Sequence, residues 1–112
     1  MPEHNKVPLD EKRMKAALRY LSSLLLNTFR ETVRLIIHGG AVMVLHPSLT
    51  RRQSTPDVDY LHRAFVAEWT KRGVPNAGDL LTSCIVQTAR VHQLGDDWMN
   101  SHADIALPMA RE

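Results

Sequence analysis

The sequence predicts a helix-rich α+β domain whose order of elements is close to that of α/β proteins. Three observations lead to this expectation: apolar residues recur at helical spacing over residues 14–29, a branched apolar run over residues 33–38 ends at two glycines, and polar and apolar residues alternate over residues 57–61. The 112 residues are enough for one hydrophobic core and too few for two. We therefore expect a flexible lead-in over residues 1–9 and a single domain over residues 10–112.

The first expected element is a long amphipathic helix. Asp10 can cap its start, because a short carboxylate accepts hydrogen bonds from the free N–H groups of a first helical turn. From Met14 to Phe29 the apolar residues repeat every three or four positions, and the lysines and arginines fall largely between them. This pattern predicts a helix of about five turns. The stretch before it contains two prolines and mixed charge, which indicates that it frays.

Shorter elements follow in the middle of the chain. The run over residues 33–38 predicts a strand that is buried on both faces, because its apolar residues do not alternate with polar ones. Residues 41–45 predict a short helix that ends before Pro47. Residues 48–56 have no periodicity and are expected to form a loop. The alternation over residues 57–61 predicts a strand with one polar face.

The second half of the chain is expected to be mainly helical. Apolar spacing predicts helices over residues 62–71 and 79–94, which are ended by Gly73 and Gly95 respectively. The last segment, DDWMNSHADIALPM, predicts a short helix that stops at Pro108. No internal repeat, low-complexity segment or linker divides the chain.

Composition and charge exclude several classes of protein. The net charge is only +2, with a pI near 9.0, so the basic excess alone does not indicate a nucleic-acid-binding protein. Cys84 is the only cysteine, which excludes an internal disulfide and a cysteine-only zinc site, and the histidines lack zinc-binding spacing. No apolar run reaches the roughly 18 residues of a membrane span. We expect a soluble, cytoplasmic protein with no membrane partner.

Asp57 and Asp59 are the strongest candidates for chemistry. Two residues apart on a strand, they point to one face at a separation of about 6–7 Å and can share one divalent ion or a pair of ions. Oxygen ligands suit Mg²⁺ or Mn²⁺, which are often shared with substrate phosphates. The Gly39–Gly40 pair lets a ligand approach the backbone just before an expected helix. Each motif alone is also compatible with a plain turn and a solvent-facing strand edge.

Taken in order, these motifs resemble the signature of the nucleotidyltransferase superfamily, which is hG[GS] followed by hDhDh. The two halves read IIHGGA and TPDVDYL here. The wording RxSTxDxDY with a downstream DWMN is similar to small nucleotidyltransferase-like proteins related to the AbiEii type of antitoxin systems. The resemblance covers about residues 33–99. It implies a minimal nucleotidyltransferase-like core, in which a short mixed sheet is flanked by several helices.

The resemblance assigns roles to the residues of both motifs. Gly39 and Gly40 would hold the phosphates of a nucleoside triphosphate. Asp57 and Asp59 would be the catalytic pair and would bind the Mg²⁺ or Mn²⁺ that bridges those phosphates.

Three further positions follow from the same resemblance. Arg52 and Thr55 match loop residues near the nucleotide, although Gln53 replaces a basic residue that the family often has two positions before the threonine. Active families also take a third carboxylate, the general base, from a later strand. Asp104 is the only candidate for it, and we expect it on a helix that flanks the site. The later strands of the family's sheet are not evident before the sequence ends.

Three functions remain open at this point. The first is metal-dependent transfer of a nucleoside monophosphate from a nucleoside triphosphate to an acceptor hydroxyl on RNA, tRNA or a protein. The second is an inactive, truncated domain that binds a nucleotide or a protein, with an exposed sheet edge that invites a homodimer. The third is a nucleic-acid-binding module that uses the basic N-terminal helix, with affinity that falls steeply with salt.

Overall fold

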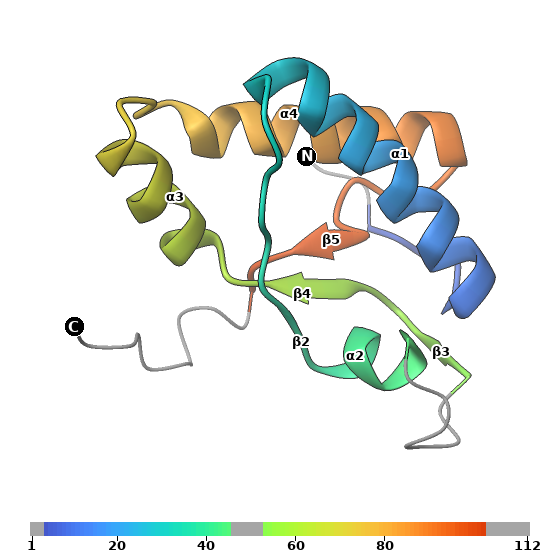
Figure 1. Ribbon diagram of the computed structural model, residues 1–112. Helices are drawn as coiled ribbons and strands as arrows, with labels where there is room; N and C mark the ends of the chain where they lie inside the picture. Colours follow the sequence, from blue (N-terminus) through green and yellow to red (C-terminus); the bar gives the residue numbers. More distant parts are fainter. Residues whose placement is uncertain (1–3, 46–52, 103–112) are drawn as a thin grey trace.

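The computed structural model describes residues 4–45 and 53–102 and confirms the helix-rich α+β class (Figure 1). Within these residues there are four helices and five short strands. The helices are α1 (Glu11–Phe29), α2 (Gly40–Leu45), α3 (His62–Lys71) and α4 (Ala77–His92). The strands are β1 (Leu9–Asp10), β2 (Ile37–His38), β3 (Ser54–Thr55), β4 (Val58–Tyr60) and β5 (Met99–Asn100). In this part of the chain, no helix is long and apolar enough to cross a membrane.

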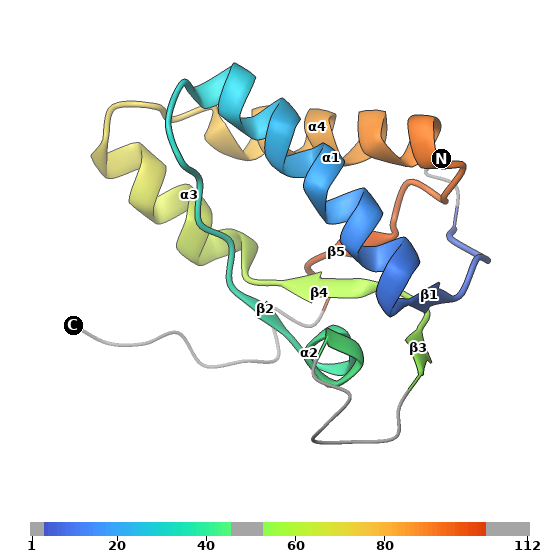
Figure 2. The same ribbon diagram turned by 45° about the vertical axis from the view of Figure 1, so that its right-hand side comes forward.

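The main sheet is short and mixed, as expected. Its strand order is β2-β4-β5, with β2 antiparallel and β5 parallel to the central strand β4. A separate antiparallel pair, β1 and β3, brings the N-terminal segment next to the stretch that leads into β4 (Figure 2). The order of the strands therefore places three distant parts of the chain around β4.

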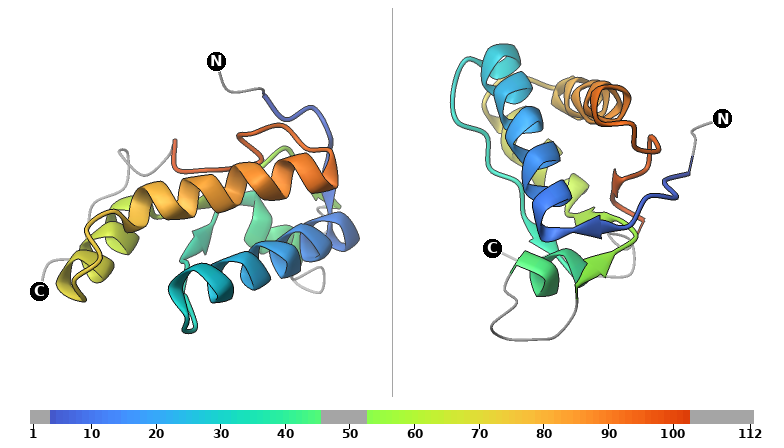
Figure 3. Two further views of the ribbon diagram at one scale, coloured as in Figure 1. Left: turned by 90° about the horizontal axis from the view of Figure 1, so that it is seen from above. Right: turned by 90° about the vertical axis from the view of Figure 1, so that its right-hand side faces the viewer.

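The sheet lies between two layers of helices. α1 and α4 contact each other above one side of the sheet and run in roughly opposite directions, while the short α2 lies on the other side (Figure 3). The β4 residues Val58 and Tyr60 are buried, which agrees with the alternation that predicts one apolar face. Trp98 is fully buried and donates from Nε1 to the backbone oxygen of Ile85 on α4 at 2.9 Å. The hydrophobic core thus joins α4 to the face of the sheet that carries Val58 and Tyr60.

The four described helices follow the sequence closely. Asp10 caps α1 as expected, because its carboxylate accepts a hydrogen bond from the backbone N–H of Arg13 at 2.8 Å. The expected helices over residues 41–45 and 62–71 are confirmed by α2 and α3. α4 begins two residues before the expected start at Asp79.

One strand expectation and one loop expectation are wrong in part. β2 is limited to residues 37–38, and the side chain of Ile36 is 56% exposed, so the run over residues 33–38 is not buried on both faces. The reason is that β2 is an edge strand with a partner on one side only. Within the expected loop over residues 48–56, residues 54–55 form β3 because they pair with β1, while residues 48–52 lie outside the described chain.

The segment DDWMN does not form the expected helix. Its residues Met99 and Asn100 form β5, and the carbonyl of Trp98 accepts a hydrogen bond from the N–H of Val58 at 2.7 Å. Pairing with the open edge of β4 satisfies this backbone, and the two-residue strand is too short to show a period in the sequence. The rest of the expected helix, from residue 103 on, lies outside the described residues.

Part of the expected lead-in is packed against the domain. Leu9 is fully buried and pairs with Thr55 in the β1–β3 ladder. Asn5 makes hydrogen bonds to Pro56 and Gly95, which belong to two other segments. Residues 4–9 therefore make contacts that the sequence did not lead us to expect.

Candidate functional site

A row of polar residues crosses the sheet on the face opposite Val58 and Tyr60. The antiparallel register sets His38 of β2 opposite Asp59 of β4, and the parallel register sets Asp59 beside Asn100 of β5. Paired residues in neighbouring strands project to the same face. The three side chains therefore share one face of the sheet, opposite the buried Val58 and Tyr60.

The glycine turn meets the aspartate strand in this row. Gly39 follows β2 with a φ of +73°, in the left-handed region that favours glycine. A Cβ atom at this position would lie 3.0 Å from Oδ2 of Asp59. The two halves of the sequence signature, 20 residues apart, thus come into direct contact. Gly40 begins α2, which has only six residues, so we ascribe no dipole effect to this helix and consider only the backbone of the turn.

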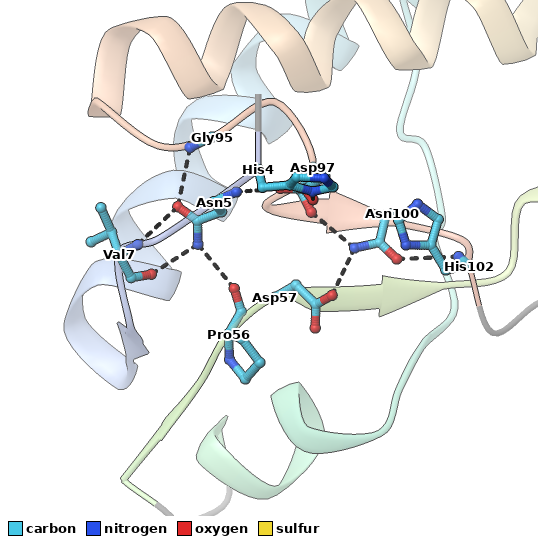
Figure 4. Close-up of polar contacts among 9 residues, drawn as sticks. All are labelled: His4, Asn5, Val7, Pro56, Asp57, Gly95, Asp97, Asn100 and His102. Atoms are coloured by element: carbon cyan, nitrogen blue, oxygen red, sulfur yellow. Dashed lines mark hydrogen bonds and ion pairs between the residues drawn. The ribbon is translucent and has the colours of Figure 1, made fainter. Parts of the chain in front are cut away.

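Asp57 lies just before β4 and is held by an amide. Its Oδ2 accepts a hydrogen bond from Nδ2 of Asn100 at 2.8 Å (Figure 4). The same Nδ2 donates to the backbone oxygen of Asp97 at 2.8 Å, and Oδ1 of Asn100 accepts from the backbone N–H of His102 at 3.1 Å. The DWMN segment therefore contributes directly to the environment of the candidate aspartates.

Burial and the neighbouring charge of Asp57 disfavour the ionised form of Asp59. Burial raises the pKa of the Asp59 carboxyl above its ordinary value, and the negative charge of Asp57 raises this pKa further. His38 and His102 lower the pKa of Asp59, but their effect is smaller. The negative charge on Asp59 is thus disfavoured in the protein alone, and a cation bound between the two carboxylates would relieve this cost.

The residues fit a magnesium or manganese ion that is shared with phosphates. Among the described residues, no group of three or more histidine, cysteine, aspartate or glutamate side chains is placed to hold a metal ion. Mg²⁺ is commonly bound through one or two carboxylates, with water and substrate phosphates completing its shell. Nε2 of His38 is buried and has no hydrogen-bond partner in the described part of the chain, so a bound group could also satisfy this atom.

Other expected site residues have different positions. Thr55 is buried in β3, and its hydroxyl donates to the backbone oxygen of Asp57 at 3.2 Å, which shapes the turn before β4. Arg52 and Asp104 lie outside the described residues.

A pocket of about 450 Å³ is lined by Asn100 and His102 together with several apolar side chains.

We expect substitution of Gly39 by alanine to impair the site more than the fold. Positive φ costs an alanine about 1–2 kcal/mol, and the added Cβ would press on the Asp59 carboxylate. Gly73→Ala is a matched control, because Gly73 also has positive φ (+89°) but a Cβ there meets nothing within 4 Å. Urea unfolding should show similar losses of stability for both variants, and calorimetry should show weaker Mg²⁺-nucleotide binding only for Gly39→Ala. Equal binding by the two variants would contradict this role of Gly39.

Three residues at the site were not predicted from the sequence. The sequence predicts Asn100 on a helix, and no sequence pattern assigns His38 or His102 to this site. The DWMN motif was the available signal for Asn100. Its position beside Asp59 depends on the parallel pairing of β5, which no local pattern reveals.

Comparison with known proteins does not assign the chain to a family. No protein-family model, curated protein or solved structure matches it.

Proposed function

We propose that this domain binds a nucleoside triphosphate together with Mg²⁺ or Mn²⁺ and transfers the nucleoside monophosphate to an acceptor hydroxyl. The observation that carries the proposal is the contact between the Gly39 turn and the carboxylate of Asp59. It brings a place where phosphate can approach the backbone next to two acids that suit a hard cation. The order of the motifs in the sequence supports the same assignment.

Each residue has a defined task in this proposal. Asp57 and Asp59 hold the ion, which supplies charge neutralisation for the phosphates when it is bound. The backbone at Gly39 and Gly40 lies against the phosphates. The acceptor oxygen forms a bond to the α-phosphorus, the bond to pyrophosphate breaks, and the proton of the hydroxyl passes to a base. RNA, tRNA or a protein could supply the hydroxyl.

A second candidate, a domain that binds nucleotide without transferring it, is favoured by Asn100. On the strand parallel to β4, Asn100 occupies the position beside Asp59. An amide does not accept a proton at neutral pH, so Asn100 cannot act as the general base. The candidate third carboxylate, Asp104, lies outside the described residues.

One experiment tests both candidates. The protein is incubated with each labelled nucleoside triphosphate and Mg²⁺, alone or with tRNA or candidate protein acceptors, and nucleotide binding is measured in parallel by calorimetry. We expect Asp57→Ala/Asp59→Ala to abolish Mg²⁺-dependent binding and label transfer. Asp79→Ala, at an exposed acid on α4, serves as the control and should leave both unchanged.

The outcomes separate the candidates. Transfer that needs Mg²⁺ and the two aspartates supports the nucleotidyltransferase. Binding with the same requirements but no transfer supports the second candidate. Binding or transfer that persists in the double variant would contradict the assignment of Asp57 and Asp59 to the metal.

A further inference from the structure

We infer that Asn100, Asp97 and Asn5 form a clamp that fixes the carboxylate of Asp57, which makes them positioning residues for the metal site. The inference rests on the proposed function, because it concerns the same ion. It also gives a role to the N-terminal segment and to the DWMN motif. The contacts that make up the clamp are drawn in Figure 4.

Asn100 forms the part of the clamp that touches Asp57. Its amide group donates to the Asp57 carboxylate and to the carbonyl of Asp97, both at 2.8 Å. Its Oδ1 accepts a hydrogen bond from the backbone N–H of His102. Both the nitrogen and the oxygen of the amide therefore have hydrogen-bond partners. The side chain is only 8% exposed and therefore has little freedom to turn. One oxygen of Asp57 is thus fixed in direction, and the other has no hydrogen-bond partner among the described residues, so a ligand could reach it.

Asn5 holds the backbone just before Asp57. Its Nδ2 donates to the carbonyl of Pro56 at 2.9 Å and to that of Val7 at 2.8 Å. Its Oδ1 accepts from the N–H of Gly95 at 3.1 Å and of Val7 at 3.3 Å. One side chain thus links the N-terminal segment, the turn after α4 and the residue that precedes Asp57.

Asp97 connects these two parts. Its carboxylate accepts from the N–H of Asn5 at 2.5 Å and contacts Nδ1 of His4 at 2.7 Å, while its carbonyl accepts from Asn100. Burial alone would raise the pKa of Asp97, but the hydrogen bonds from His4 and Asn5 outweigh burial and lower it. Gly95 leaves room for this arrangement, because a Cβ there would overlap the backbone of His4 and Asn5.

Two routes of hydrogen bonds, which Asp97 connects, therefore reach Asp57. One reaches its side chain through Asn100, and the other reaches its backbone through Asn5 and Pro56. Groups that orient the ligands of a metal ion determine its affinity, and their loss typically costs about 10–100-fold. A network that served only the fold would have no reason to affect metal affinity under conditions where the variant remains folded.

The clamp is tested with Mn²⁺ alone as the probe. Increasing Mn²⁺ is added to the full chain, and paramagnetic broadening of its NMR signals gives both the place and the affinity of binding. We expect wild type to broaden first around Asp57 and Asp59, and Asn100→Ala to weaken Mn²⁺ binding by about 10–100-fold. Asn27→Ala, at an exposed position on α1, is the control and should bind as wild type does.

Two isosteric variants test the rest of the clamp. Asn5→Asp keeps the acceptor for Gly95 but loses the donor for Pro56, and Asp97→Asn loses the charge that binds His4 and Asn5. Each should weaken Mn²⁺ binding by about 10-fold at a temperature where circular dichroism shows it to be folded. If Asn100→Ala does not fold, these two variants still decide the question.

A double-mutant cycle separates positioning from general structural damage. Because the clamp acts through Asp57, Asn5→Asp should have no further effect on Mn²⁺ binding once Asp57 is alanine. Folded variants that bind Mn²⁺ within twofold of wild type would overturn the clamp while leaving the metal site intact. An equal loss in the Asp57→Ala background would also overturn it. Wild type that shows no broadening near Asp57 would overturn the metal site itself, and the clamp with it.

Discussion

Replacement of Trp98 by alanine is expected to destabilise the domain by about 3–5 kcal/mol. The side chain is fully buried, and its removal leaves a large cavity and breaks its hydrogen bond to the carbonyl of Ile85. The backbone groups at position 98 also bond to Val58 and Gly95. Without the buried side chain to hold this position in place, these bonds should weaken, and the effect should spread to β5. Domains of this kind have about 5–15 kcal/mol of total stability, so the variant would lose a large share of it.

Urea unfolding followed by far-UV circular dichroism measures this loss. Trp98→Phe keeps an aromatic ring and loses the donor to Ile85, so its loss should be smaller, about 1–3 kcal/mol. Val91→Ala, at a side chain on α4 that is 53% exposed, should change stability by less than about 0.5 kcal/mol. A loss below about 2 kcal/mol for Trp98→Ala would show that Trp98 does not anchor β5 to α4.

The helices could be predicted from the sequence because their signals are local. The spacing of apolar residues over α1 and the capping carboxylate of Asp10 lie within the element that they define. The strands β1, β3 and β5 have two residues each, too few for a period to appear. They exist because distant segments pair, as Leu9 does with Thr55 and Met99 with Val58. This pairing is a property of the tertiary fold.

The residues of the candidate site also fall into two groups, those that the sequence reveals and those that it does not. Asp57, Asp59 and Gly39 could be proposed from the sequence, because a short ordered motif carries them. Asn100 could not be placed, because its position depends on the register of β5 against β4. Asn5 lies in a segment without periodicity, and its contacts span about 50 and 90 positions of the chain. Long-range polar contacts of this kind leave no periodic signal.

We expect Asp59→Asn to make the ligand-free domain more stable at pH 7 and to remove the proposed Mg²⁺-dependent nucleotide binding. Burial and the charge of Asp57 raise the pKa of Asp59 in the folded state. An acid with a raised folded pKa contributes stability at low pH, and that contribution is lost as the pH rises from the ordinary value through the folded pKa. Asparagine resembles the protonated carboxyl and cannot lose a proton, so the variant avoids the free-energy cost of a negative charge at this position. A gain of about 1 kcal/mol would be typical of a relieved functional site.

The same substitution should have the opposite effect on binding. Asp59→Asn removes one of the two proposed charged ligands, so Mg²⁺-nucleotide affinity should fall by more than about 100-fold, beyond the range for residues that only position ligands. Saturating Mg²⁺ and nucleotide should therefore raise the unfolding temperature of wild type but not of the variant. Thermal unfolding between pH 3 and pH 8, with and without these ligands, measures both effects, and Asp79→Asn on the exposed surface of α4 is the control.

The sign of the stability change distinguishes two roles for Asp59. If the variant is less stable than wild type at pH 7, the attraction between Asp59 and the two histidines, His38 and His102, outweighs burial, and the carboxylate belongs to the fold. If the ligand-free variant is more stable and loses binding, the protein retains an acid that costs it stability. Such a cost is expected where the charge is needed to bind a cation. The carboxylate that packs against Gly39 would then be kept for function.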